Sequence, residues 1–169
     1  MKTKFVQPAL VCGLLATMTF FTITGCKKSS SGSSGGSVTG TLSGSGYQST
    51  QAFGVVTASS NVFFVGGIRI KSGDTTDLSV TFPDTVALNT AIPFDGSTVF
   101  IDYLDEKTLT EYTNEGSYTL SGSITISSWN KSSLVITGAF TGTIYNPLNS
   151  NDSLVVTNGA FSNVKYTIQ

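Results

Sequence analysis

Histidine is absent from this 169-residue chain, and its two cysteines, Cys12 and Cys26, both lie near the amino terminus. The region that follows therefore lacks the side chains that bind zinc and other soft metals, and it lacks the histidine base of a catalytic triad. A disulfide within that region is excluded as well. We expect neither a metal nor a cofactor.

Basic residues are also scarce. The formal charge of −1 for the whole chain includes four lysines before residue 29, whereas from Val38 onward five basic residues stand against ten acidic ones, a formal charge of −5. Proteins that bind a phosphate backbone need a basic surface, so nucleic acid is not an expected partner.

No apolar run is long enough for an ordinary membrane-spanning helix. The longest, residues 9–21, has 13 residues, fewer than the roughly 20 that a bilayer requires. It follows Lys2 and Lys4 and precedes Ile23-Thr24-Gly25-Cys26, a pattern typical of a bacterial lipobox. We predict a signal peptide over residues 1–25, cleavage before Cys26 and lipidation of the Cys26 thiol, whose thiolate is the required nucleophile. An uncleaved membrane helix is the alternative, which Pro8 and Gly13 disfavour.

The residues after Cys26 predict where the protein is held. Lys27 replaces the aspartate that commonly retains lipoproteins in the inner membrane, so we predict an outer-membrane lipoprotein, periplasmic or surface-facing, anchored by its acyl chains. Residues 26–37 are nearly all Ser, Gly and Lys and predict a flexible tether. A G-x-S-x-G match at residues 32–36 has no histidine to serve it and is accidental. Residues 38–169 then form a single domain.

Within this domain the hydrophobic pattern has a period of two. Leu78, Val80 and Phe82 alternate with Ser79 and Thr81, which is typical of a strand with one buried face. Strands are predicted near residues 38–43, 51–58, 62–71, 76–82, 98–104, 117–127, 133–145 and 152–168, with residues 83–96 as the one long loop. About eight antiparallel strands indicate an all-β fold, a β-sandwich, with a lipocalin-like closed β-barrel as the alternative.

Glycines on apolar faces mark special positions. Gly138 and Gly142 lie on the apolar face of their predicted strand and indicate a bend, a bulge or the close approach of a second sheet. Asn158-Gly159 fits either a two-residue hairpin or a glycine bulge within one bent strand.

Several segments resemble a known family. They are Gly116-Ser117-Tyr118, Gly138-Ala139-Phe140-Thr141-Gly142, Val156-Thr157-Asn158-Gly159-Ala160-Phe161 and Val164-Lys165-Tyr166. They look like a family of small lipoproteins of Gram-negative bacteria in which a lipobox precedes an all-β domain of unknown function. The resemblance implies an envelope protein and carries no active site.

The only cluster of candidate catalytic groups is acidic: Asp102, Asp105, Glu106, Glu111 and Glu115. Paired carboxylates serve glycoside hydrolysis or calcium binding. The spacing of a calcium loop is missing, so we interpret these acids as solvated and expect no catalytic residues.

Trp129 and Tyr112 are the candidate ligand contacts, because aromatic rings stack on sugars. The alternative, which we prefer, is that Trp129 caps the open end of the core. Thr75, Thr85 and Ser153 each follow an aspartate and precede a small or apolar residue. This is similar to the acceptor tripeptide for O-glycosylation in bacteria where the family is common, so we predict modification there.

Function is predicted in outline only. We expect a lipid-anchored, noncatalytic binding module, not an enzyme, for a glycan, an apolar small molecule or another envelope protein. The alternative is a structural or accessory subunit of an outer-membrane assembly, and a carboxylate-dependent hydrolase is the least favoured. An internal cavity would favour binding, and a filled core a structural role.

Overall fold

The computed structural model describes residues 35–116 and 120–169, so the predicted signal peptide, Cys26 and most of the tether lie outside it. The described residues form strands β1 Ser37–Leu42, β2 Ser45–Gln48, β3 Gln51–Thr57, β4 Val62–Lys71, β5 Asp74–Pro83, β6 Ala91–Pro93, β7 Phe100–Asp105, β8 Thr110–Thr113, β9 Gly122–Asn130, β10 Val135–Asn146 and β11 Asn149–Ile168. The all-β prediction is confirmed. Within these residues no helix has the length and apolar character needed to span a bilayer.

The strand count differs from the prediction because three strands are very short. β2, β6 and β8 have three or four residues each, too few for a period of two to be recognised. The expectation that residues 83–96 are one long loop is wrong, since β6 lies within them and pairs with β9.

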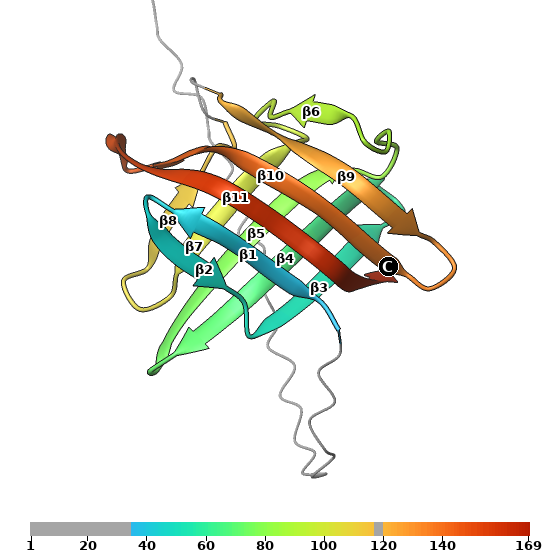
Figure 1. Cartoon of the computed structure of the whole chain (residues 1–169). Coiled ribbons are helices and arrows are strands. Elements are labelled where there is room, and N and C mark those ends of the chain that lie inside the picture. Colours follow the sequence, from blue (N-terminus) through green and yellow to red (C-terminus); the bar gives the residue numbers. More distant parts are fainter. Residues whose placement is uncertain (1–34, 117–119) are drawn as a thin grey trace, which may run out of the picture. The chain divides into compact units, whose positions relative to one another are not determined.

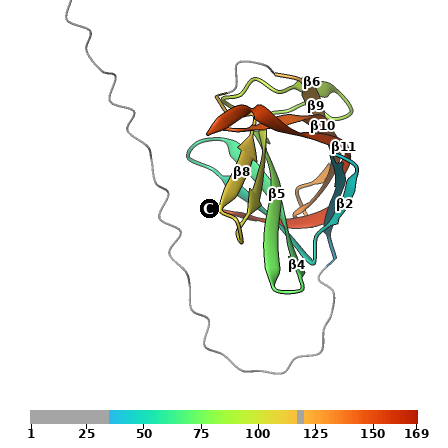
Figure 2. The same ribbon diagram turned by 90° about the vertical axis from the view of Figure 1, so that its left-hand side faces the viewer.

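All the described strands join one sheet, in the order β2-β1-β11-β3-β4-β5-β7-β8-β10-β9-β6, and an additional β10–β11 pairing curls it into a ring (Figures 1 and 2). This topology differs in detail from both predicted arrangements. A sandwich has two separate sheets, whereas here the sheet is continuous. In a regular barrel each strand is hydrogen-bonded to its neighbours along most of its length, whereas here β8 meets β10 only at Thr113 and Tyr145. The prediction of purely antiparallel strands is also wrong, because β11 pairs with β3 in parallel.

The inner face of the ring carries the core. Leu78, Val80 and Phe82 of β5 are at most 1% exposed, as their alternation predicts. The expectation that only one face of this strand is buried is wrong, because Ser79 and Thr81 are buried as well, at 7% and 8% exposed. Phe82 stacks on Phe63 with ring centroids 5.1 Å apart and on Phe161 at 6.3 Å. Phe140 continues this column of phenylalanine rings at 6.3 Å from Phe161. The middle of the ring is therefore filled with side chains.

The glycine predictions are confirmed in two respects. A Cβ on Gly138 would lie 2.3 Å from the Phe161 ring, so glycine is needed where that ring approaches the backbone. The β10–β11 register also shifts between Ile136 and Gly138 and between Phe140 and Gly142, which marks bulges. Asn158 lies inside the continuous strand β11 with φ of 51°, so its segment is a bulge and the hairpin alternative is wrong.

Candidate functional site

Trp129 lies at one end of the ring, where its contacts are with other side chains of the core. Its indole N–H donates to the Tyr166 hydroxyl at 2.9 Å, and its ring meets Phe63 edge-on with centroids 5.1 Å apart. Lys131 Nζ lies 5.0 Å from the centre of the indole. These contacts cover much of the ring, as expected of a side chain that caps the core. We call Phe63, Trp129 and Tyr166 the tryptophan end.

Tyr112 lies near the opposite end of the same strands. Trp129 pairs with Ile136 of β10, whereas Thr113, next to Tyr112, pairs with Tyr145. Nine residues of an extended strand separate these two positions, or roughly 30 Å. The structure therefore does not bring the two candidate ligand contacts into one site.

Three tyrosines line the end at which Tyr112 lies. Tyr47 of β2 meets Tyr103 of β7 edge-on at a centroid distance of 6.4 Å, and Tyr103 lies 6.3 Å from Tyr112 of β8. The Tyr112 hydroxyl donates to Asp152 Oδ2 at 2.9 Å. Tyr47 is buried, whereas Tyr103 and Tyr112 are half-buried and keep part of each ring accessible.

Arg69 of β4 completes this group, which we call the tyrosine end: Tyr47, Arg69, Tyr103, Tyr112 and Asp152. Its guanidinium carbon lies 4.9 Å from the centre of the Tyr47 ring. Nε donates to Thr76 Oγ1 at 3.1 Å and one terminal nitrogen donates to the Gly46 carbonyl at 3.2 Å. A stacked guanidinium with two hydrogen bonds has little rotational freedom left.

Tyr47 is itself held in a single protonation state. Its hydroxyl donates to the Gly67 carbonyl and also lies 3.2 Å from the Thr76 carbonyl. Burial, reinforced by the negative charge of Asp77, raises the pKa of Tyr47 above its usual range. Tyr47 is therefore a neutral platform for Arg69 at every pH at which the protein would be expected to work.

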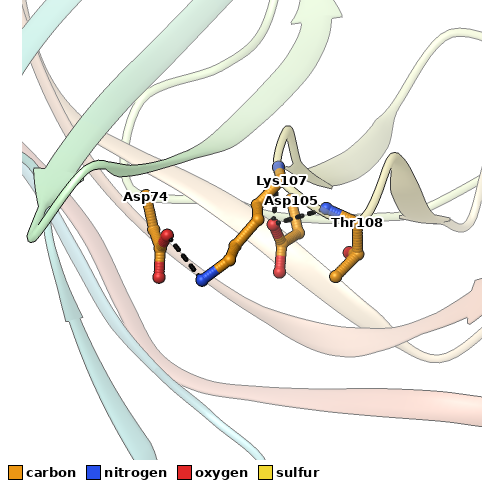
Figure 3. Close-up of polar contacts among 4 residues, drawn as sticks. All are labelled: Asp74, Asp105, Lys107 and Thr108. Carbon is orange, nitrogen blue, oxygen red and sulfur yellow. Dashed lines mark hydrogen bonds and ion pairs between the residues drawn. The ribbon is translucent and has the colours of Figure 1, made fainter.

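A hollow of about 330 Å³ adjoins Arg69, lined by Arg69, Lys71, Ser72, Asp74 and Thr76. Asp74 forms an ion pair with Lys107, with Nζ and Oδ1 2.9 Å apart (Figure 3). Asp105 accepts hydrogen bonds from the backbone N–H groups of Lys107 and Thr108 at 3.0 and 3.3 Å. The hollow thus combines two cations and two hydroxyls with one carboxylate, Asp74, which already has a cationic partner.

A second hollow of about 350 Å³ lies across β9, β10 and β11. Its lining is Ser123, Thr125, Ala139, Phe140, Thr141, Thr157, Asn158 and Gly159. The lining has hydroxyl and amide groups but no charged side chain, and its one aromatic residue, Phe140, is only 3% exposed. It offers a ligand less stacking surface and less charge than the tyrosine end.

The acidic cluster predicted from the sequence does not line either hollow. Asp102 accepts a hydrogen bond from the Thr113 hydroxyl, and burial, with the nearby charges of Glu115 and Glu111, raises its pKa to about 6 although that hydrogen bond acts in the opposite direction. Glu106 and Glu111 are exposed, whereas Asp102 is half-buried, so the interpretation of these acids as solvated is wrong for Asp102. Among residues 35–116 and 120–169 no three acidic, histidine or cysteine side chains are grouped so as to hold a metal ion.

The three predicted glycosylation residues differ in accessibility. Thr85 is exposed in the turn after β5, and Ser153 is exposed on β11 beside Asp152. Thr75 is half-buried in β5, where it pairs with Ile70 of β4. Cys26, the predicted lipidation site, is outside the described residues.

Tyr47 and Arg69 were not identified from the sequence. They lie 22 residues apart, on strands that do not pair with each other. The only sequence signal for Arg69 is its rarity, because it is the single arginine after residue 28 and follows an apolar strand. Its contact with Tyr47 depends on how the β1–β2 hairpin folds over β4.

Comparison of the chain with models of known protein families, with curated proteins and with solved structures finds no match. The resemblance to small envelope lipoproteins therefore stays a prediction.

Proposed function

We propose that this protein is a lipid-anchored envelope protein whose β domain is a noncatalytic module that binds a glycan at the tyrosine end. The observation that carries the proposal is the pair of half-buried rings, Tyr103 and Tyr112, between a fixed arginine and a hydrogen-bonded aspartate. Sugar rings stack their C–H faces on aromatic rings, and their hydroxyls bond to charged side chains.

The filled interior supports a glycan over an apolar small molecule. A lipocalin-like module would hold an apolar ligand inside the ring, but the phenylalanine column occupies that space. Both hollows given above are instead lined by polar side chains. A glycan bound at an outer end needs no internal cavity.

Binding is tested with the full-length lipoprotein in detergent, first on a glycan array and then by calorimetry with any glycan captured. Tyr112→Ala is expected to lower affinity about tenfold through lost stacking. Tyr145→Ala is the matched control. Tyr145 is also half-buried and pairs with Thr113, but it is not part of the tyrosine end. If no glycan binds, or if both variants lose affinity equally, the tyrosine end is not a glycan site.

A structural or accessory subunit is the second candidate, and the filled core is the observation in its favour. Such a subunit needs a protein partner and no small ligand. Absence of glycan binding, together with co-purification of an outer-membrane protein at fixed stoichiometry, would favour this candidate over the first.

Anchoring is tested separately by replacing Cys26 with Ser and labelling cells with radioactive palmitate. The natural protein is expected to carry the label and to sediment with outer membranes. The variant is expected to lose both properties, because serine is too weak a nucleophile to accept the lipid. A variant that still carries the label would show that Cys26 is not the anchor.

A further inference from the structure

The cations of the tyrosine end and of the hollow beside it, Arg69 and Lys71, differ from the nearby carboxylates in what they already bind. Asp74 has Lys107, Asp105 has two backbone N–H groups, and Asp152 has the Tyr112 hydroxyl and the Asn146 amide at 3.4 Å. By contrast, in the described part of the chain neither Arg69 nor Lys71 forms an ion pair with a carboxylate. Asp77 also has an oxygen, Oδ1, that is buried without a hydrogen-bond partner, but it does not line the hollow. Among the charged groups that line the hollow, Arg69 and Lys71 are those without an ion-pair partner.

These two cations lie on the same face of one strand. Arg69 and Lys71 are two residues apart on β4, where alternate side chains point to the same side. Both line the 330 Å³ hollow together with Ser72, Thr76 and Asp74, whose carboxylate is paired with Lys107. A hollow of this size is within the range that accommodates a sugar residue. The hydroxyls supply further hydrogen bonds for the ligand.

Arg69 is also fixed before any ligand arrives. The guanidinium lies over the Tyr47 ring, Nε donates to Thr76, and one terminal nitrogen donates to the Gly46 carbonyl. The other terminal nitrogen has no protein acceptor among the described residues. A planar guanidinium whose free edge is already oriented suits a carboxylate, which is also planar.

We infer that the ligand of the tyrosine end is a glycan with an isolated acidic sugar, a uronic acid, whose carboxylate pairs with Arg69 and Lys71 while Tyr103 and Tyr112 stack on neighbouring sugar rings. This inference rests on the glycan-binding function proposed above. The formal charge of −5 from Val38 onward repels polyanions at long range, so an isolated carboxylate fits better than a heavily sulfated or phosphorylated chain.

The test compares aldobiouronic acids, in which one uronic acid is joined to a neutral sugar, with the same disaccharides after reduction of the carboxyl group. Stereochemistry and linkage are then identical, and only the carboxylate is replaced, by an uncharged hydroxymethyl group. The full-length lipoprotein in detergent is expected to bind the acidic member about tenfold more tightly, because a charge-assisted hydrogen bond is lost on reduction. Equal affinity for both members would overturn the inference and leave the glycan-binding proposal standing, whereas binding of neither would overturn both.

Three variants assign the preference to residues. Arg69→Gln is expected to abolish the preference for the acidic member, and to lower affinity for the reduced member by a smaller factor, because the acidic member alone loses the charge-assisted pair. Lys71→Gln is expected to reduce the preference by a smaller factor. Because the Lys71 side chain is exposed, this substitution should not unfold the protein, so a reduced preference reports on binding. Lys165→Gln, at an exposed position on β11, is the matched control and should keep the full preference. A preference retained in both Arg69→Gln and Lys71→Gln would also overturn the inference.

Discussion

The two ends of the ring are both rich in aromatic side chains, but these have different partners. At the tryptophan end, Trp129, Phe63 and Tyr166 contact one another, and the indole N–H bonds to a tyrosine hydroxyl. At the tyrosine end, Tyr47 stacks on Arg69 and Tyr112 bonds to Asp152. Trp129 is half-buried like Tyr103 and Tyr112 and also has a cation, Lys131, over its ring, so exposure does not distinguish the two ends. They differ in their polar partners: the indole N–H bonds to another aromatic residue of the core, whereas the tyrosine end has Arg69 and Asp152, which can also bond to a ligand.

The largest expected difference between the two ends is in stability. Trp129→Ala removes the contacts with Phe63 and Tyr166 and leaves a cavity, so the free energy of unfolding should fall by about 2–4 kcal/mol. Tyr112→Ala should cost less, about 1 kcal/mol, because the ring is smaller and contacts one other aromatic ring, Tyr103, where Trp129 contacts two. Urea titration of the two variants measures both values. Equal losses would remove the distinction between a structural end and a ligand-binding end.

A smaller effect is expected at Gly138 of β10, which lies between the two ends and nearer to the tryptophan end. Gly138→Ala places a methyl group against the Phe161 ring, which is already packed on both sides, and overpacking of this kind should cost about 1–3 kcal/mol. Gly46→Ala is the control, since no atom lies within 4 Å of its added Cβ. Thermal unfolding should show a lower midpoint for the first variant and nearly no change for the second. A neutral Gly138→Ala variant would show that the column of rings is loosely packed.

The pH dependence of stability tests the burial of Asp102, which lies on β7 next to Tyr103 of the tyrosine end. Burial raises the pKa of Asp102 from 3.8 to about 6, so the folded protein binds this proton more tightly than the unfolded chain does. The resulting stabilisation is complete below about pH 4 and is lost as the pH rises through 6. Asp102→Asn should therefore raise the free energy of unfolding at pH 7, by up to about 2 kcal/mol, and by little at pH 4. A variant that is less stable than the natural protein at pH 7 would contradict this account.

Glycosylation should change mass without changing stability measurably. Thr85 and Ser153 are exposed and Thr75 is half-buried, so modification is expected at Thr85 and Ser153 before Thr75. Intact-mass measurement of the natural lipoprotein, compared with Thr85→Ala and Ser153→Ala, identifies each site through the lost sugar increment. A mass equal to the lipidated chain alone would disprove the modification. A glycan on Ser153, next to Asp152, is further expected to weaken ligand binding at the tyrosine end.

The longer strands could be predicted from the sequence because their pattern is local. Residues 62–71 and 76–82 were predicted, and β4 and β5 span Val62–Lys71 and Asp74–Pro83. The inward residues of β5 alternate with hydroxyl residues, and β4 begins with a short apolar run, so a short window is enough for each. The candidate site was predicted only through Tyr112, because its other members carry no local signal. From the sequence, Trp129 and Tyr112 are both simply aromatic residues that could contact a ligand. Their different surroundings appear only in the structure, where Trp129 bonds to Tyr166 and Tyr112 to Asp152.

The sequence by itself determined that the domain is all-β, which side chains of the long strands point inward, and that Gly138 and Gly142 sit where the backbone is bulged or closely approached. Each of these follows from the spacing of side chains along one strand or from the absence of a Cβ. Only the tertiary structure decided that the sheet closes into a ring, that β11 meets β3 in parallel, and that Tyr47, Arg69, Tyr103 and Tyr112 share one end. The physical reason is that strand order and register are set by pairings between residues far apart in the chain, which no local pattern encodes.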